Sequence, residues 1–209
     1  MPTQVSASTL EQFRHAAAGQ QPTPAGVAVA AVAAAFALGL LVKVLTISGR
    51  RKALPDTTAR LEALAAAAQA ASQRMLQLAG DDSAAFEAYL TARRMPHATD
   101  SERQARQQAL DATVRRAIDL PLAAAQEAAA GLQLCGETSA ATPPALVADL
   151  GVAATLLAGA LRGFLLCAQS NVRQLAPDAA SHRERLAAET KRHEQALQQA
   201  AALLESMQS

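Results

Sequence analysis

The sequence has no Trp, one Tyr, four Phe and only two cysteines. The scarcity of aromatic residues excludes single-strand nucleic-acid binders that stack bases on aromatic side chains. The formal net charge of +1, from 19 basic and 18 acidic residues, excludes the basic surface typical of duplex binders. Cys135 and Cys167 have no metal-type spacing and are too few for a disulfide framework. We therefore expect reduced thiols, no metal site and no nucleic-acid partner.

Neither a signal peptide nor a clear membrane span is recognisable. The start, Met1 to Val5, lacks a basic n-region and an apolar run. Ala25 to Val42 is a stretch of eighteen residues without a charge, which reaches the lower limit for a bilayer span, but it is mostly Ala, Gly and Val. A second apolar stretch, Ala145 to Cys167, includes Asp149 and Arg162, which are costly at a membrane centre. We expect two core helices of a cytoplasmic protein with no membrane partner.

Alanine makes up about a quarter of the chain and is the best helix former. Apolar residues recur at steps of three and four, as in Leu61, Leu64, Ala68, Ala71 and Met75. We predict an all-α fold, a single domain over residues 1–209 that is a bundle of five or six Ala-rich helices. The expected helices cover about 3–17, 25–47, 57–94, 99–136 and 142–176, with a last one from 178, a bend at Gly80 and a kink at Pro121.

Two of these helices, at 25–47 and 142–176, are apolar nearly all round. Such helices belong at the centre of a bundle, or at a centre that continues into a subunit interface. Because one bundle of 209 residues can hide only a limited apolar surface, we predict a homodimer. The alternative is a monomer in which both helices are simply central.

No standard catalytic motif is present: there is no Gly-x-Ser-x-Gly elbow, phosphate loop or dinucleotide fingerprint. The four histidines stand in polar surroundings, and we expect them at the surface. Asp149 is more informative, because a carboxylate buried in an apolar helix without a partner costs several kcal/mol. It is either functional or a first-turn residue that stabilises the free N–H groups of its helix. Asp82 follows Gly80, and its ordinary interpretation is a helix cap.

Short segments along the chain, in order and with compatible spacing, resemble the motifs of one family. They are Thr23-Pro-Ala-Gly-Val-Ala-Val-Ala-Ala31, Leu45-Thr46 followed by Gly49-Arg-Arg-Lys52, Asp82-Ser-Ala-Ala-Phe86 followed by Arg94-Met-Pro96, Pro121, Asp149-Leu-Gly-Val-Ala153 and Asn171-Val-Arg-Gln-Leu175. The resemblance is to the cyclodeaminase and methenyltetrahydrofolate cyclohydrolase family, which includes the cyclodeaminase half of formiminotransferase-cyclodeaminase.

This resemblance implies a dimeric, all-helical enzyme that acts on a folate one-carbon adduct, with a tetrahydrofolate derivative as substrate and no further cofactor. In the cyclohydrolase type, water opens the methenyl bridge; in the cyclodeaminase type, a ring nitrogen attacks a formimino carbon and ammonia leaves. Both reactions need a general acid–base group. Carried over to this chain, the resemblance assigns the catalytic carboxylate to Asp149. It assigns substrate binding to Thr23, Pro24, Gly26, Thr46, Arg50, Lys52, Asp82 and Asn171, and metal binding to no residue.

The chain also departs from the family pattern. A glycine triplet is here Ala25-Gly26-Val27, so two positions gain a Cβ atom and lose access to positive φ. Family asparagines are replaced by Val44 and Cys167, and the serine before the aspartate by Ala148. These changes keep the packing residues and remove polar groups that would hold a pterin. They leave open an alternative, a catalytically silent paralogue that serves as a binding or interaction module.

Overall fold

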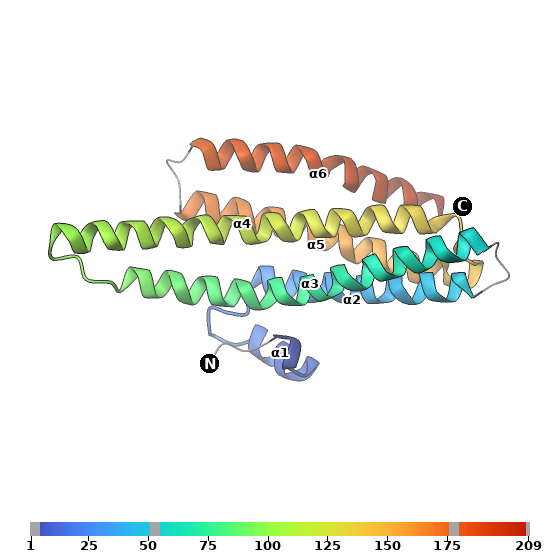
Figure 1. Cartoon of the computed structure of the whole chain (residues 1–209), viewed down its shortest axis with the longest axis horizontal. Coiled ribbons are helices and arrows are strands. Elements are labelled where there is room, and N and C mark those ends of the chain that lie inside the picture. The colour runs from blue at the N-terminus through green and yellow to red at the C-terminus, as the bar shows by residue number, and fades with distance from the viewer. Residues whose placement is uncertain (1–4, 51–54, 176–179, 208–209) are drawn as a thin grey trace.

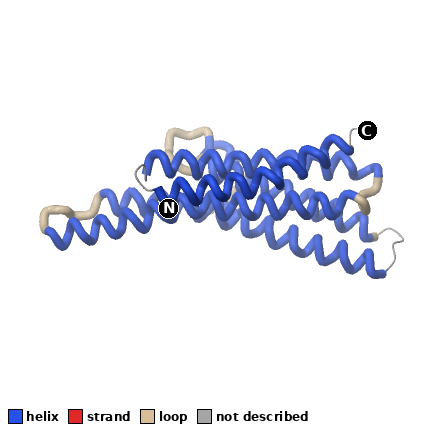
Figure 2. The backbone as a smooth tube through the Cα atoms, turned by 90° about the horizontal axis from the view of Figure 1, so that it is seen from above, coloured by secondary structure: helices blue, strands red, loops and turns tan. Residues whose placement is uncertain are grey.

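The computed structural model describes residues 5–50, 55–175 and 180–207, and all its regular elements are helices (Figures 1 and 2). Within these ranges the elements are the 3-10 helices η1 (Val5–Ala7) and η2 (Pro144–Leu146) and the α-helices α1 (Leu10–Ala17), α2 (Gly26–Gly49), α3 (Pro55–Arg93), α4 (Asp100–Ser139), α5 (Val147–Leu175) and α6 (Ala180–Ser206). The predicted all-α fold is confirmed.

Four long helices form the body of the molecule. Helix α2 packs against α3 and α5, and α4 packs against the same two helices, while α6 lies outside against α4 and α5. The core is built from small and medium-sized side chains, with Leu38, Leu41, Leu157, Leu161 and Phe164 fully buried. Because alanine fills most of the remaining core positions, the helices must approach closely to bury apolar area.

A close approach between core helices occurs at Gly131 of α4. A Cβ atom at this position would lie 3.1 Å from side-chain atoms of both Leu38 in α2 and Leu157 in α5. The absence of a side chain at Gly131 therefore lets α4 approach the two apolar helices. This contact crosses the bundle and joins its two halves.

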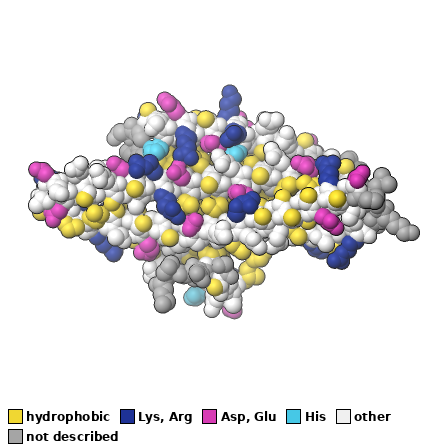
Figure 3. Space-filling view, viewed as in Figure 1, with side chains coloured by type: hydrophobic (Ala, Val, Ile, Leu, Met, Phe, Trp, Pro, Cys, Tyr) yellow, Lys and Arg dark blue, Asp and Glu magenta, His cyan; other side chains and the backbone are white. Residues whose placement is uncertain are grey.

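Helices α2 and α5 are the apolar helices that the composition predicts to be central. By length and composition, α2 and the stretch Pro144–Gln174 could each cross a membrane, and 56% and 39% of their most apolar windows are buried inside the protein. Both helices contribute to the main core, which confirms the prediction that they are core helices. Their outer faces nevertheless leave Val29, Phe36, Val152, Leu156 and Leu166 exposed. The front face in Figure 3, over α3 and α4, instead carries interspersed acidic and basic side chains.

Helices α3 and α4 are much longer than α2. In Figure 1 both continue well past the first residues of α2, toward the left of the view. At this end the first turn of α2 and parts of α3, α4 and α5 line a cavity. The chain enters α2 here from a loop whose Thr23–Pro24 peptide bond is cis.

Three local expectations are wrong. The first α-helix begins at Leu10 rather than near residue 3, because Thr9 caps it through a capping box with Gln12. Helix α3 continues through Gly80, so Asp82 lies inside the helix and is not a cap. His193 of α6 is 3% exposed, although we expected it at the surface. The side chain is buried because α6 packs against α4 and α5. The sequence of α6 is largely polar and therefore did not indicate this burial.

Candidate functional site

A cavity of about 490 Å³ lies where α2 begins, between the first turn of α2 and parts of α3, α4 and α5. Four of the residues predicted for substrate binding line it: Thr23, Gly26, Asp82 and Asn171. An adjoining cavity of about 850 Å³ shares Pro22 and Thr23 with the first and is lined by Pro24. The structure thus brings together five predicted residues that are up to about 150 positions apart in sequence.

The N-terminus of α2 supplies backbone donors to this pocket. Ala25, the residue before the helix, is extended (φ −122°, ψ −157°) and provides no side-chain cap, so the first N–H groups of α2 have no intrahelical acceptor. Gly26 is in close contact with α5, since a Cβ atom there would lie 3.1 Å from Cys167 Sγ. None of the described residues has a positive φ. The loss of the flanking family glycines therefore leaves the backbone unstrained, and Gly26 acts through its small size.

One face of α3 lines the pocket with Asp82, Phe86, Tyr89 and Arg93, at steps of four, three and four residues. The sequence analysis missed the last three as site residues. Their helical spacing from Asp82 could have revealed them, because residues at such steps share one face of a helix. Arg93 also lies over the ring of Tyr89, 5.9 Å from its centroid, which positions both side chains at the end of the pocket.

Asp82 is the ionisable group that the pocket perturbs most clearly. Burial raises the pKa of its carboxyl from the ordinary value of 3.8 to about 6. Within the described part of the chain, no cation forms an ion pair with it, whereas the neighbouring Asp81 is exposed and lies 3.6 Å from Arg116. Burial, followed by the charge of Asp82, also raises the pKa of Cys167. The pocket thus contains a carboxyl group that changes charge near neutral pH and a thiol that stays protonated.

Asn171 is held in the pocket by an unusual backbone acceptor. Pro121 lies inside α4 and has no N–H group, so the carbonyl of Ala117, four residues earlier, has no partner at that position of the helix. The Asn171 side chain donates its Nδ2–H to this carbonyl at 2.7 Å. Its Oδ1 is left as an acceptor for a ligand. Pro121 and Asn171, which match motifs of the family and are far apart in sequence, are therefore linked through the carbonyl of Ala117.

The other predicted residues lie at the opposite end of the bundle. Asp149 is in the first turn of α5 and forms an ion pair with Lys43 of α2 (Oδ2–Nζ 2.8 Å). Thr46 and Arg50 are exposed at the end of α2, and Lys52 lies outside the described residues. Asp149 precedes Cys167 by 18 residues of continuous helix, which corresponds to about 27 Å. Within one protomer, the predicted residues therefore form two separate groups, and the prediction for Asp149 stays a prediction.

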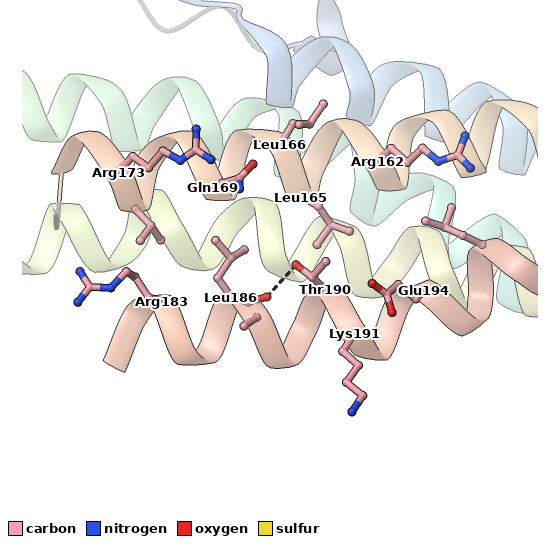
Figure 4. A pocket seen from close by; sticks show the side chains of 13 residues that line it. Arg162, Leu165, Leu166, Gln169, Arg173, Arg183, Leu186, Thr190, Lys191 and Glu194 are labelled. Atoms are coloured by element: carbon pink, nitrogen blue, oxygen red, sulfur yellow. Dashed lines mark hydrogen bonds between the residues drawn. The ribbon is translucent and has the colours of Figure 1, made fainter. Parts of the chain in front are cut away.

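A larger groove lies elsewhere in the structure. It has a volume of about 1010 Å³ and lies between α5 and α6, where Leu165 and Leu186 project toward each other (Figure 4). Thr190 donates its hydroxyl hydrogen to the carbonyl of Leu186 and is thus engaged in its own helix. None of the predicted site residues lines this groove. We prefer the smaller pocket as the reactive site, since it combines a perturbed carboxyl with free helix N–H groups and an oriented amide.

No group of three or more His, Cys, Asp or Glu side chains in residues 5–50, 55–175 and 180–207 is arranged to hold a metal ion. The polar side chains that line the pocket instead include a carboxyl, two amides, hydroxyls and the guanidinium of Arg93. These groups suit proton transfer and hydrogen bonding to an organic ligand.

The fold and the pocket together define a class of protein: an all-helical bundle with a polar pocket at the N-terminus of a central apolar helix. Residues 9–192 match the family model described as formiminotransferase-cyclodeaminase, and the chain belongs to this family. It is 28% identical over 178 residues to methenyltetrahydrofolate cyclohydrolase of Methylorubrum extorquens, which covers 85% of each chain.

Two further relatives agree with this assignment. Formimidoyltransferase-cyclodeaminase of Sus scrofa is 32% identical over 164 residues, which are 76% of this chain and 29% of that protein. The crystal structure of formiminotetrahydrofolate cyclodeaminase from Thermotoga maritima matches with a TM-score of 0.82 over 97% of this chain and 96% of that one. Its sequence identity is 21%, so this likeness shows the fold.

Proposed function

We propose that this chain is a folate one-carbon enzyme that opens or closes the methenyl bridge of tetrahydrofolate. The activity would be of the methenyltetrahydrofolate cyclohydrolase or the formiminotetrahydrofolate cyclodeaminase type, as the names of its relatives suggest. The reaction would take place in the pocket at the start of α2. The observation that carries the proposal is Asp82, a partly buried carboxyl with a pKa of about 6 inside that pocket.

The chemistry of both reactions fits such a group. In the cyclohydrolase direction, water attacks the cationic methenyl carbon, a C–O bond forms and a ring C–N bond breaks. The attacking water must lose a proton, and the leaving ring nitrogen must gain one. A carboxyl with a pKa of about 6 is mostly ionised at neutral pH, so it can accept the first proton and still donate the second. Its negative charge also stabilises the cationic carbon of the substrate.

The remaining pocket groups suit binding. The free N–H groups of the first turn of α2 can donate to a carbonyl oxygen of a pterin ring, and Asn171 Oδ1 can accept from a ring N–H. Phe86 and Tyr89 supply flat apolar surface for the ring. Arg93, at the end of the pocket, suits an acidic group.

The test is turnover of methenyltetrahydrofolate, followed by the loss of its near-ultraviolet absorbance, and release of ammonia from formiminotetrahydrofolate. We expect the wild type to turn over one of the two, and Asp82→Asn to lower kcat by about 10²–10⁴-fold. Asp81→Asn is the matched control, because Asp81 is the adjacent but exposed carboxylate. We also expect kcat/KM to rise with pH around pH 6, as Asp82 of the free enzyme ionises.

The catalytically silent paralogue is the alternative. It predicts that Val27, Val44 and Leu146 fill the cleft that Asp149 would face. Val44 is indeed buried in the core, whereas Val27 lines the pocket at the start of α2. The presence of this pocket favours the enzyme. A wild type that neither turns over the two substrates nor binds a folate by calorimetry would overturn the proposal and favour the silent module.

The homodimer and the cytoplasmic location expected from the sequence stay predictions. For the dimer, the support is the exposed apolar surface of α2 and α5, which includes Phe36 at 55% and Leu166 at 65% exposure. An apolar surface of this kind on helices with few charges is typical of subunit interfaces.

A further inference from the structure

The pocket at the start of α2 has one acidic and one basic side chain at different levels of the same helix. Among its described lining residues, Asp82 is the one carboxyl group and Arg93 is the one guanidinium. Both residues belong to α3, which is continuous from Pro55 to Arg93. Arg93 follows Asp82 by eleven residues, which corresponds to about 16 Å along the helix. The pocket is therefore polarised along α3, with a negative end and a positive end.

The guanidinium of Arg93 is folded back over the preceding turn of α3. Its Cζ lies 5.9 Å from the centroid of the Tyr89 ring, and Tyr89 is one turn closer to Asp82. Side chains on a helix lean toward its N-terminus, so this contact brings the charge of Arg93 back to the level of Tyr89. Tyr89 follows Asp82 by seven residues, which corresponds to about 10 Å along the helix. The two charged groups are thus closer to each other than their backbone positions are.

Arg93 is held at its backbone and has no acidic partner for its side chain. No carboxylate of residues 5–50, 55–175 and 180–207 forms an ion pair with its exposed guanidinium. Arg74, on the same helix, is by contrast paired with Glu127. Arg106 of α4 donates an Nη2–H to the backbone carbonyl of Arg93 at 3.4 Å, which ties the end of α3 to α4. The guanidinium of Arg93 is therefore positioned at the pocket and available to an anion.

The proposed substrates have charges that complement this arrangement. Their reacting carbon is bonded to nitrogen and is cationic, and their glutamate tail is anionic. A benzene ring and an amide separate the reacting carbon from the first carboxylate of the tail, which places the two about 10 Å apart in an extended molecule. With the cationic carbon at Asp82, this carboxylate reaches the guanidinium of Arg93. Phe86 and Tyr89 line the pocket between the two charges and suit the flat, apolar part of the ligand.

We propose that Arg93 binds a carboxylate of the substrate's glutamate tail, an inference that rests on the proposed folate activity. The planar guanidinium offers a carboxylate two parallel N–H donors. Tyr89 is a positioning residue, because its ring holds the guanidinium over the pocket. The pocket thereby selects folates, which have this tail, over free pterins, which lack it. This assignment differs from the one that the sequence resemblance implies, in which Arg50 and Lys52 bind the tail.

Kinetics with and without the charge of the tail test the role of Arg93. The two compounds are methenyltetrahydrofolate and its analogue with a neutral methylamide in place of the glutamate. We expect Arg93→Ala to raise KM for methenyltetrahydrofolate about 10- to 100-fold with little change in kcat, and to leave KM for the neutral analogue unchanged. Arg93→Lys should have an intermediate effect, since it keeps the charge and loses the two parallel donors. Equal effects on both compounds would show that Arg93 only stabilises the end of α3, and would overturn the proposal.

Three further variants show whether the effect is specific to this guanidinium. Arg94→Ala is the matched control, because it removes the adjacent arginine, which is also exposed and lines the adjoining cavity instead. We expect it to leave both KM values unchanged. Tyr89→Leu should raise KM for methenyltetrahydrofolate alone, by a smaller factor than Arg93→Ala. Arg50→Ala tests the rival assignment: if it removes the preference for the charged tail while Arg93→Ala keeps that preference, the proposal is wrong.

A binding measurement separates this proposal from the proposed function. Calorimetry gives the Kd of 5-formyltetrahydrofolate, a stable folate with the same tail, for the wild type and for Arg93→Ala. We expect Kd to rise about 10- to 100-fold in the variant. If the wild type turns over no folate but shows this difference in Kd, the proposed function fails while the tail site holds. If the wild type turns over methenyltetrahydrofolate and the neutral analogue with the same KM, the function holds and the tail site is overturned.

Discussion

The carboxyl group of Asp82 affects stability and activity in opposite directions. The folded protein favours its protonated form, with a pKa of about 6 against an ordinary 3.8, so the folded state binds more protons between these pH values. Stability therefore falls as pH rises from about 4 through 6, and the full penalty is present above pH 6. This penalty is typical of a group that is kept for chemistry rather than for packing.

We predict that Asp82→Asn raises the free energy of unfolding by about 1–3 kcal/mol at pH 8, because the amide carries no charge to desolvate. The gain should largely disappear near pH 4, where Asp82 of the folded wild type is protonated and carries no charge to desolvate. Urea denaturation of the two proteins at pH 4 and pH 8 measures the difference. An equal gain at both pH values would show that packing, rather than ionisation, is responsible.

Asn171 and Pro121 are coupled through the carbonyl of Ala117. We predict that Asn171→Ala lowers the free energy of unfolding by about 1–3 kcal/mol, since it leaves the carbonyl of Ala117 without its donor. In a Pro121→Ala background the restored N–H of residue 121 can donate to that carbonyl, so the same change should cost less. A double-mutant cycle in urea measures the coupling between the two positions. Additive effects would contradict the link between them.

At the scale of elements, α6 carries a buried ionisable group. His193 is 3% exposed, and burial lowers its pKa, an effect partly opposed by Glu189, whose Oε2 lies 3.5 Å from Nε2. The folded state thus favours the neutral imidazole. Stability from this group is fully present above the ordinary pKa of 6.5 and is lost as pH falls below it.

We predict that His193→Leu makes the docking of α6 less sensitive to acid. The free energy of unfolding of the wild type should fall more steeply between pH 7 and pH 5 than that of the variant, because the unfolded wild type takes up a proton at His193 that the folded state disfavours. Hydrogen exchange of the α6 amides at both pH values shows where the change occurs. Parallel pH profiles for the two proteins would count against this role of His193.

The helices themselves were largely predictable, because their apolar period extends over many turns. The continuity of α3 across Gly80 was expected as well, whereas the position of Asp82 inside this helix, rather than at a cap, was not. A glycine costs about 1 kcal/mol in a helix, and Gly80 lies where a side chain would meet open space. Packing of α3 on α2 and α4, together with the Arg74–Glu127 pair (Nε–Oε1 2.8 Å), outweighs this cost. Packing contacts between helices, which cannot be read from the sequence, therefore outweigh the low helix propensity of this glycine.

At the scale of the whole molecule, the sequence identified candidate residues but not their grouping. Thr23, Gly26, Asp82 and Asn171 meet in one pocket because α2, α3 and α5 converge there. Asp149 lies at the far end, because α5 runs antiparallel to α2. Register between long helices depends on side-chain packing across the bundle, and no local pattern reports it. The hydrogen bond from Asn171 to the carbonyl of Ala117 was hidden for the same reason.

The starting position of α2 has a consequence for how such proteins diverge. Since α3 and α4 continue past Gly26, the end of the pocket consists of helices that stay in place whatever precedes α2. Residues 18–25, which connect α1 to α2, therefore shape the mouth of the pocket without taking part in the main core. Insertions or deletions in this connection would change the size of the pocket mouth while leaving the bundle intact, because none of its residues belongs to the main core.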